Sequence, residues 1–282
     1  MTQPGDIARL MAAHAHDPGV QETQTRYRAR LVERWNIAAG SRVLEIACGQ
    51  GDTTAVLADA VGPDGRVTAV DVADPEYGAP VTLGESAAWL LASPLGPRLD
   101  IRLGCDLLDP AVSFPDDAFD EAMLVHGGWY FPNLDTLART LARVRPWARR
   151  LRIAEWDLEP AAFAQVPHLL AVLIQGLVEG SNPASEANVR SPFSRQRLLA
   201  LLAETGWTVS EQASIDTGGL QDAGWEIDHT LHATLAEADT LPLPRAVRDL
   251  VASQGDILRA LAASPDRRPL PAYALTAERS RH

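Results

Sequence analysis

The stretch SRVLEIACGQGDTT, residues 41 to 54, decides the fold of this 282-residue chain. The apolar run at residues 43 to 46 is typical of a short buried strand. Gly49 and Gly51 predict a sharp turn after it, and their missing Cβ atoms let a ligand approach the backbone. Residues 52 to 54 can cap a helix, whose first turn offers unpaired N–H groups. The stretch therefore predicts the start of a nucleotide-binding β-α-β unit.

Downstream, residues 66 to 70 predict a second strand, which ends at Asp71, 20 residues after Gly51. An acidic side chain at this position can accept hydrogen bonds from both ribose hydroxyls of a bound adenosine. We therefore expect Asp71 to hold the sugar of a nucleoside cofactor.

Two classes of cofactor use this layout. Dinucleotide enzymes carry G-x-G-x-x-G, and counting from Gly49 the third glycine position is Thr54, so that pattern is absent. Glu45, just before the turn, would face a pyrophosphate in such an enzyme and suits a cationic ligand better. These two residues disfavour a nicotinamide oxidoreductase.

The stretch VLEIACGQG, residues 43 to 51, resembles the first motif of the class I S-adenosylmethionine (SAM) dependent methyltransferases, roughly V-L-[DE]-h-G-x-G-x-G with h apolar. Ala47 replaces the first glycine of the motif, and we expect alanine to exclude a backbone angle available only to glycine. The resemblance covers residues 41 to 158 and implies SAM as the cofactor. The cofactor-binding residues are then expected to be Glu45, Ala47, Gly49, Gly51, Asp71, Asp106 and Tyr27.

Strand and helix patterns alternate as far as residue 158, which predicts an α/β fold with a doubly wound, mostly parallel sheet. The resemblance implies the seven-stranded, Rossmann-like methyltransferase fold, in which the last strand inserts antiparallel beside the sixth. The further strands are expected at residues 99–104, 119–125, 150–158, 207–215 and 273–279. Ligands of such sheets bind at the carboxyl ends of the strands, where residues 47–51, Asp71, Asp106 and His126 all fall.

The chain is interpreted as an N-terminal helical cap segment, residues 1 to 40, followed by a SAM-binding methyltransferase domain, residues 41 to 282. Helical insertions at about residues 159 to 190 and 221 to 262 are expected to form the acceptor pocket. In the resembled family a leading segment often folds over the cofactor, which on that basis alone makes Tyr27 a candidate contact.

The predicted fourth strand ends at His126, which two glycines follow. Histidine titrates near neutral pH, so His126 is the candidate catalytic base, and the alternative is a hydrogen bond within its own loop. The segment HGGWYF, which begins at His126, replaces the [DN]-P-P-[YF] turn of methyltransferases that act on nucleobase or glutamine amino groups. We predict methyl transfer to a small molecule by in-line displacement, in which positioning supplies most of the rate.

Aromatic residues and histidines supply the candidate acceptor pocket. Trp129 and Tyr130 follow the fourth strand and are expected to wall the pocket rather than pack as core. Trp225 and His229 lie one turn apart on a predicted helix and could line the same pocket, although an ordinary amphipathic face is the preferred explanation. His229 and His232 have no third ligand nearby in the sequence, so no metal site is predicted.

The chain carries a net charge of −12, and all 25 of its basic residues are arginine. Nucleic-acid binding needs clustered cations, so this balance argues against a nucleic-acid partner. The arginine-rich stretch at residues 143 to 152 is interpreted as a solvated corner, with a basic interaction site as the alternative.

The start of the chain lacks the features of a signal peptide, and the apolar run at residues 169 to 178 is too short to span a bilayer. We therefore expect a cytoplasmic protein without a membrane partner, and the sequence leaves a homodimer open. The alternative function is a SAM-binding protein of the same fold that transfers no methyl group, such as a cyclase or a binding module.

Overall fold

The computed structural model describes residues 2 to 280. Its centre is a sheet of seven strands in the order β3-β2-β1-β4-β5-β7-β6. The strands are β1 (Arg42–Ile46), β2 (Arg66–Val70), β3 (Leu99–Arg102), β4 (Phe119–Val125), β5 (Ala148–Trp156), β6 (Trp207–Ile215) and β7 (Ala272–Arg279). β1 to β5 pair in parallel, and β7 runs antiparallel between β5 and β6. The predicted doubly wound fold with an antiparallel last strand is confirmed.

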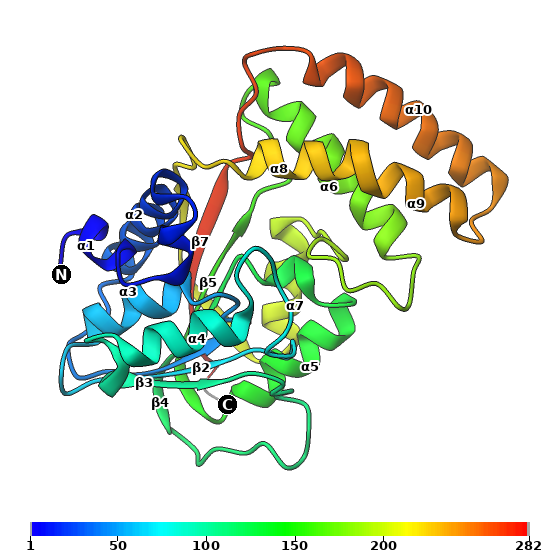
Figure 1. Cartoon of the computed structure of the whole chain (residues 1–282). Helices are drawn as coiled ribbons and strands as arrows, with labels where there is room; N and C mark the ends of the chain where they lie inside the picture. The colour runs from blue at the N-terminus through cyan, green and yellow to red at the C-terminus, as the bar shows by residue number, and fades with distance from the viewer. Residues whose placement is uncertain (1, 281–282) are drawn as a thin grey trace.

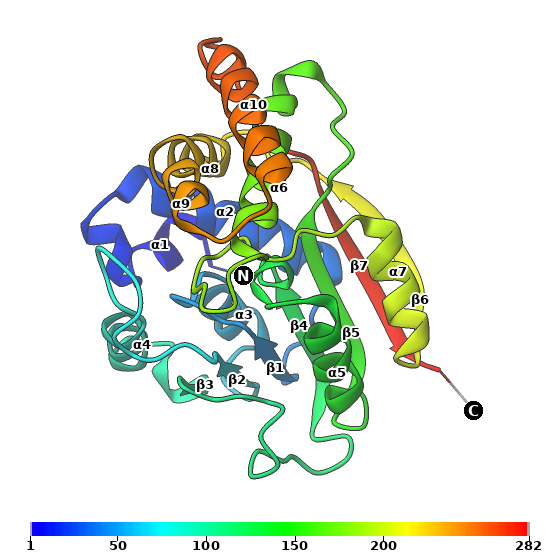
Figure 2. The same cartoon turned by 90° about the vertical axis from the view of Figure 1, so that its right-hand side faces the viewer.

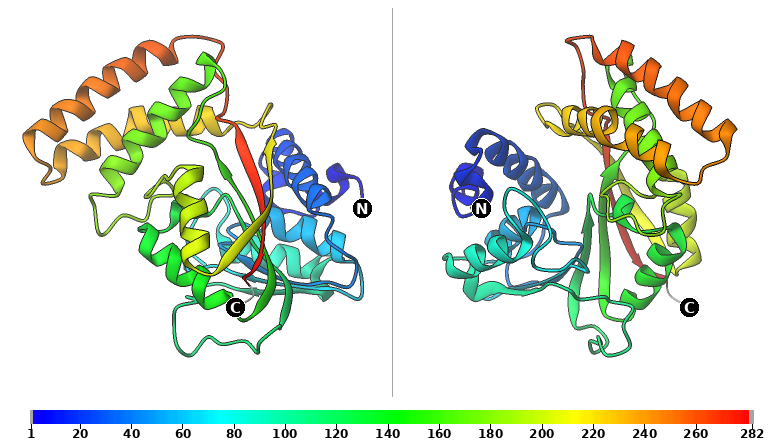
Figure 3. Two further views of the ribbon diagram at one scale, coloured as in Figure 1. Left: turned by 180° about the vertical axis from the view of Figure 1, so that it is seen from behind. Right: turned by 45° about the vertical axis from the view of Figure 1, so that its right-hand side comes forward.

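Helices cover both faces of the sheet (Figure 1, Figure 3). α1, α2, α3 and α4 lie on one face, and α5 and α7 lie on the other. The bounds are α1 (Pro4–Ala8), η1 (Ala12–Ala15), α2 (Pro18–Trp35), α3 (Asp52–Val61), α4 (Leu83–Ala92), η2 (Gly96–Arg98), η3 (Gly128–Tyr130), α5 (Leu134–Val144), η4 (Phe163–Gln165) and α7 (Arg195–Glu204).

The central strands are buried on both faces, as their continuous apolar runs require. In β1 every residue after Arg42 is buried, and so is every residue of β2 after Arg66. In α2, Tyr27, Leu31 and Trp35 recur at helical spacing, and all three side chains are buried. α2 packs along α3, so the N-terminal segment is tied to the same core as the sheet.

Four further helices form what we call the helical lobe, which lies beyond the carboxyl ends of the parallel strands (Figure 2). They are α6 (Val166–Glu179), α8 (Asp222–His229), α9 (Leu235–Thr240) and α10 (Arg245–Ala262). A π-helical turn, η5 (Thr230–Thr234), joins α8 to α9 in one continuous helix. The lobe has a small core of its own, which includes Ile174, Ile227 and Leu258. The lobe helices fall within residues 159 to 190 and 221 to 262. That these segments are insertions that form an acceptor pocket, and the division of the chain into two segments, stay predictions. Among residues 2 to 280, no helix is both long and apolar enough to cross a membrane.

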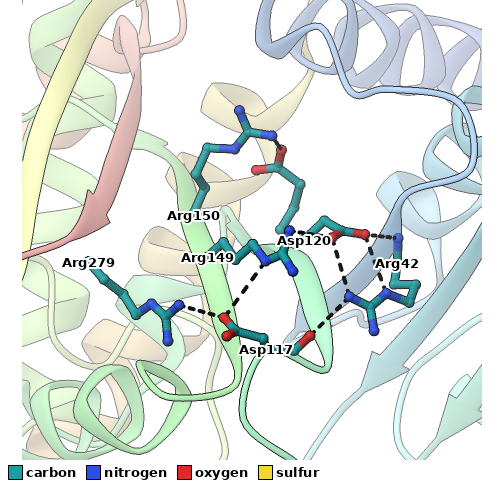
Figure 4. Close-up of polar contacts among 7 residues, drawn as sticks. Arg42, Asp117, Asp120, Arg149, Arg150 and Arg279 are labelled. Carbon is teal, nitrogen blue, oxygen red and sulfur yellow. Dashed lines mark hydrogen bonds and ion pairs between the residues drawn. The ribbon is translucent and has the colours of Figure 1, made fainter.

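The amino ends of the parallel strands carry a network of ion pairs (Figure 4). Arg42 at the start of β1 contacts Asp120, with 3.3 Å between NH2 and Oδ1. At the start of β5, Arg149 lies 3.7 Å from Asp117 and 3.8 Å from Asp120, and Arg279 at the end of β7 bonds Asp117 from the other side. These contacts pair the exposed charges at the end of the arginine-rich stretch and support the solvated corner over a basic interaction site.

Candidate active site

The glycine turn between β1 and α3 adopts left-handed backbone angles. The φ angles are +56° at Ala47, +53° at Gly49 and +88° at Gly51. The φ of Ala47 lies in the small left-handed region that residues other than glycine can also adopt, so the expected exclusion of an angle open only to glycine stays a prediction. The chain must leave β1 abruptly to enter α3, and the strain of a left-handed alanine, about 1–2 kcal/mol, is carried by the packing around it. A Cβ at Gly127 would lie 2.8 Å from that of Ala47, so the ends of β1 and β4 are in close contact.

The helix after the turn begins differently from the prediction. Gly51 occupies the N-cap position of α3, and no side chain caps the helix. Thr54 instead donates a hydrogen bond of 2.6 Å to Glu45, and Asp52 accepts one of 2.8 Å from Gln21 of α2. The polar residues that resembled a cap thus connect the turn to its neighbours and leave the first N–H groups of α3 free of side-chain partners.

Glu45 is a buried carboxyl group, 2% exposed, beneath the turn. Burial raises its pKa to about 8, and the bond from Thr54 and the charge of Arg28 act in the opposite direction. A buried acid with a raised pKa becomes easier to ionise when a cation arrives beside it. This environment fits the cationic ligand expected from the sequence.

Asp71 lies where the glycine turn and the end of β2 meet. Its Oδ2 accepts a 2.8 Å hydrogen bond from the N–H of Gly49, and its Oδ1 accepts one of 2.9 Å from Ala73. A carboxylate oxygen has a second acceptor position, so both oxygens can still take a ribose hydroxyl. The carbonyl of Asp71 accepts from the N–H of Cys105, which brings the exposed Asp106 to the same edge of the sheet.

A shallow depression lies beside the turn. It is lined by Cys48, Gly49, Gln50, Gly51, Thr54, Ala87, Leu90 and Ile101. A Cβ added at Gly51 would lie 2.5 Å from Leu90, whereas one at Gly49 would meet nothing within 4 Å. Glycine is favoured at position 51 by its φ of +88° and by the contact with Leu90, and at position 49 it leaves open space in front of the backbone.

His126 lies between the cap and the sheet, 8% exposed and with a φ of +53°. Its Nε2 is 2.7 Å from the hydroxyl of Tyr27, and its Nδ1 is 3.4 Å from Oε1 of Glu155 at the end of β5. Glu155 also accepts hydrogen bonds from the N–H groups of Gly128 and Trp156. Burial lowers the pKa of His126, and Glu155 partly opposes that shift. Nε2 of His126 is hydrogen-bonded to Tyr27, and its Nδ1 faces the carboxylate of Glu155 without a hydrogen bond; we call the three residues the Tyr27-His126-Glu155 relay.

Buried polar atoms without hydrogen-bond partners gather around the relay. Within residues 2 to 280 these include Nδ1 of His126, Nε1 of Trp129, Nε2 of His168, the hydroxyl of Tyr273 and Nε of Arg28. The ring of Trp156 lies between those of His126 and His168, at 4.7 and 5.3 Å. Buried polar groups are normally paired, and an exception points to a ligand or an ordered water.

The four predicted pocket residues occupy different environments. Trp129 is 2% exposed and belongs to the main core, whereas Tyr130 is 39% exposed. Trp225 is 50% exposed, and His229 is exposed on the same side of α8. The inward side of α8 is polar: Asp222 accepts a 2.9 Å bond from Gln24, and Glu226 accepts one of 2.7 Å from Gln175. The structure therefore joins Tyr27 and His126 but sets Trp225 and His229 apart from them, at the surface of the lobe.

Sequence reasoning missed Glu155, Arg28 and the inward residues of α8. Glu155 lies in RLRIAEWDL, where it is an acidic residue near the end of a predicted strand, so its position relative to His126 was a usable signal. Among residues 2 to 280, no group of three or more His, Cys, Asp or Glu side chains is placed to hold a metal ion.

Known proteins resemble this chain in architecture and in sequence. The family model of protein-L-isoaspartate(D-aspartate) O-methyltransferase matches residues 16–75. The crystal structure of a cyclopropane-fatty-acyl-phospholipid synthase-like protein from Lactobacillus casei ATCC 334 is 34% identical, covers 99% of this chain and 100% of its own, and superposes with a TM-score of 0.85.

Two curated relatives are named as methyltransferases. Methyltransferase phomM' of Diaporthe leptostromiformis is 29% identical over 211 residues, which are 61% of this chain and 54% of the relative. The 2-phytyl-1,4-naphtoquinone methyltransferase of Synechococcus elongatus is 38% identical over 122 residues, 43% of this chain and 48% of the relative. The chain thus spans about half the length of these relatives. With its sheet order, glycine turn and these similarities, the chain belongs to the class I SAM-dependent methyltransferase family.

Proposed function

We propose that this protein transfers a methyl group from SAM to a small-molecule acceptor. The observation that carries the proposal is the meeting of several strand ends at one edge of the sheet. There the glycine turn, Asp71, Asp106 and His126 lie together, and a hydrogen bond from Gly49 to Asp71 fixes the turn against β2. Ligands of doubly wound sheets bind at this edge.

The residues present fit SAM. Asp71 would hold the ribose hydroxyls, and Asp106 would accept from the adenine amino group. Glu45, buried and with a raised pKa, would face the ammonium group. The open space in front of Gly49 allows close approach, and Ala47 keeps the turn sharp. When bound, SAM supplies the methyl group on a sulfonium leaving group, so the protein itself forms no covalent bond.

The Tyr27-His126-Glu155 relay would remove the proton of the acceptor. Glu155 faces Nδ1 of His126, which favours the tautomer with its proton on Nδ1. Nε2 then accepts from the hydroxyl of Tyr27. As the acceptor gives its proton to Tyr27, Tyr27 passes its own to Nε2, and no charge is left on the phenol. Burial raises the pKa of Tyr27 well above its usual value, so Tyr27 relays a proton rather than ionising.

The acceptor would lie between the relay and the helical lobe. Trp129 and Tyr130 of η3 would border it, whereas Trp225 and His229 face away from it on the exposed side of α8. A small molecule is supported by the naphthoquinone named for one relative and by the net charge of −12, which disfavours nucleic acid. The polar groups of Gln175 and Glu226 suit an acceptor with hydrogen-bonding substituents.

The proposal is tested by measuring the conversion of SAM to S-adenosylhomocysteine with a panel of phenols, hydroquinones and carboxylic acids. SAM-dependent formation of a methylated product is the expected result. Tight SAM binding with no turnover on any acceptor would favour a SAM-binding protein without methyl transfer. Binding of NADH in place of SAM would reject the proposal.

A further inference from the structure

Arg28, in the middle of α2, makes no side-chain hydrogen bond or ion pair with the rest of residues 2 to 280. Its side chain is half-buried, and its Nε is shielded from solvent with no hydrogen-bond partner. Its neighbour Arg30, in contrast, bonds the carbonyl of Asp216 at 3.0 Å and lies 3.7 Å from the carboxylate of the same residue. A shielded guanidinium N–H without an acceptor costs free energy, so the position of Arg28 needs an explanation.

The neighbours of Arg28 on α2 show where it points. Gln21 and Gln24 precede it by seven and four residues, which places all three on one face of the helix. Gln21 reaches Asp52 beside the glycine turn, and Gln24 reaches Asp222 on α8. Arg28 therefore projects from the helix face that looks across the site, from the turn to the helical lobe.

The guanidinium also lies close to the groups that would carry out the reaction. Its central carbon is 5.1 Å from the centre of the ring of Tyr27, whose hydroxyl contacts His126. Burial is the main cause of the shifted pKa values of Glu45 and His126, and the positive charge of Arg28 acts to lower both pKa values. Arg28 is thus a cation of the proposed binding site itself.

The carboxylates of the protein around this site already have other donors. Glu45 accepts from Thr54, Asp222 accepts from Gln24, and Glu155 accepts from two backbone N–H groups. A guanidinium presents a planar set of donors that matches a carboxylate. The complementary group for Arg28 is therefore a carboxylate brought by a ligand.

We propose that Arg28 binds a ligand carboxylate in the space between the glycine turn and the helical lobe. This inference rests on the proposed function. The carboxylate has two sources, the amino-acid part of SAM or an acidic acceptor, and the binding chemistry is the same for both.

The test compares Arg28→Gln with wild type in the full-length protein by calorimetric titration. The ligands are SAM, S-adenosylhomocysteine and 5′-methylthioadenosine, which keeps the nucleoside but lacks the amino-acid carboxylate. If the cofactor supplies the carboxylate, the first two should bind about 10- to 100-fold more weakly, and methylthioadenosine should bind as before. Arg28→Lys should recover part of the loss, because it keeps the charge but not the planar donors.

If an acceptor supplies the carboxylate, all three nucleosides should bind Arg28→Gln normally. Benzoate and malonate, titrated into the complex with S-adenosylhomocysteine, should then bind the variant at least about tenfold more weakly than wild type. Arg26→Gln, on the exposed side of α2, is the matched control and should change none of these affinities.

Equal binding of all nucleosides and carboxylates by wild type and Arg28→Gln would overturn the proposal. So would an equal loss for SAM and methylthioadenosine, because Arg28 would then act on the nucleoside or the fold. Failure of the proposed function looks different: wild type itself would bind neither SAM nor methylthioadenosine. In that case benzoate and malonate, titrated into the protein alone, still decide whether Arg28 binds a carboxylate.

Discussion

The two ends of the parallel strands are built on opposite principles. At the amino end, the charges of Arg42, Asp117 and Asp120 are paired with one another and with arginines of β5 and β7 (Figure 4). At the carboxyl end, Nδ1 of His126, Nε1 of Trp129 and the hydroxyl of Tyr273 are buried without hydrogen-bond partners among residues 2 to 280. Buried polar groups are normally paired, and an exception points to a ligand or an ordered water. One end is arranged for stability and the other for a ligand.

A hollow of about 480 Å³ at the amino end shows why shape alone does not locate the site. Arg145, Arg149 and Arg279 line it. Yet Arg145 bonds the carbonyls of Gly206 and Ser280, and the other two arginines face Asp117. The arginines of this hollow already have hydrogen-bond or ion-pair partners, whereas Arg28 at the carboxyl end has none within residues 2 to 280.

Removing a buried charge at the amino end should have the largest effect. Glu121 is 1% exposed, and it lies 2.7 Å from Arg150 and 3.0 Å from Arg152, whose side chain is also buried. Glu121→Gln would leave Arg152 uncompensated, so we expect a loss of about 3–5 kcal/mol in the free energy of unfolding. Denaturant titration measures it.

The matched control is Asp120→Asn, which breaks a more exposed pair with Arg42 and should cost about 0–1 kcal/mol. The folded fraction of both variants should bind SAM as wild type does. A changed SAM affinity in folded Glu121→Gln would show that the two ends of the sheet are energetically coupled. It would contradict separate roles for the amino end in stability and the carboxyl end in ligand binding.

His126→Ala should have the next largest effect, on turnover. Loss of a general base typically slows a reaction by about 10²- to 10⁴-fold, while SAM affinity should change less. Steady-state kinetics together with a SAM titration separate the two effects, and equal losses in both would make His126 a binding residue. Tyr27→Phe, which keeps the ring but removes the hydroxyl of the relay, should lower turnover in the same direction.

The relay also predicts a dependence on pH. The base must be neutral, and burial lowers the pKa of His126 below its ordinary value of about 6.5. As the pH is lowered, turnover by wild type should therefore stay constant through pH 6.5 and fall only at lower pH. A fall in turnover that already begins above pH 6.5 would contradict a buried His126 as the base.

Asp71→Ala should weaken SAM binding by about 1–3 kcal/mol, because the ribose hydroxyls lose their acceptors. The variant also loses the bonds to Gly49 and Ala73, so its fold must be checked by circular dichroism. Asp74→Ala, an exposed residue of the same loop, should leave affinity unchanged. An unchanged dissociation constant in folded Asp71→Ala would remove Asp71 from the site.

The contrast between the two ends also explains what the sequence could predict. Periodic apolar runs determine which residues enter the sheet, and parallel strands place their ends at one edge, so Asp71 and His126 could be assigned to it. The angle at Ala47 could not be predicted, because tertiary packing overrides the local preference of alanine.

The orientation of single side chains could not be predicted from the sequence either. Trp225 and His229 share a helix face with either orientation, and contacts of Asp222 and Glu226 with distant residues decide which face turns inward. Glu155 becomes a partner of His126 only because β4 and β5 pair in one register. The role of Arg28 could not be predicted from the neighbouring sequence, because it follows from the missing hydrogen-bond partner that only the structure shows.

The smallest expected effect is the release of a proton from Glu45 when SAM binds. Burial raises the pKa of Glu45 to about 8, so the free protein holds Glu45 mostly protonated at pH 7. An ammonium group beside it would favour the carboxylate, and SAM binding should then release up to one proton. Binding that releases protons strengthens as pH rises, so SAM affinity should increase between pH 6 and 8, by at most about tenfold per pH unit.

Calorimetric titrations in phosphate and in Tris at one pH measure the released proton, because the two buffers absorb it with different heats. Glu45→Gln should abolish the buffer dependence, since the amide cannot titrate. Methylthioadenosine, which lacks the ammonium group, should release no proton from wild type. If SAM and methylthioadenosine give the same buffer dependence, the proton does not come from a pairing of Glu45 with the ammonium group, and the raised pKa would be a consequence of the fold alone.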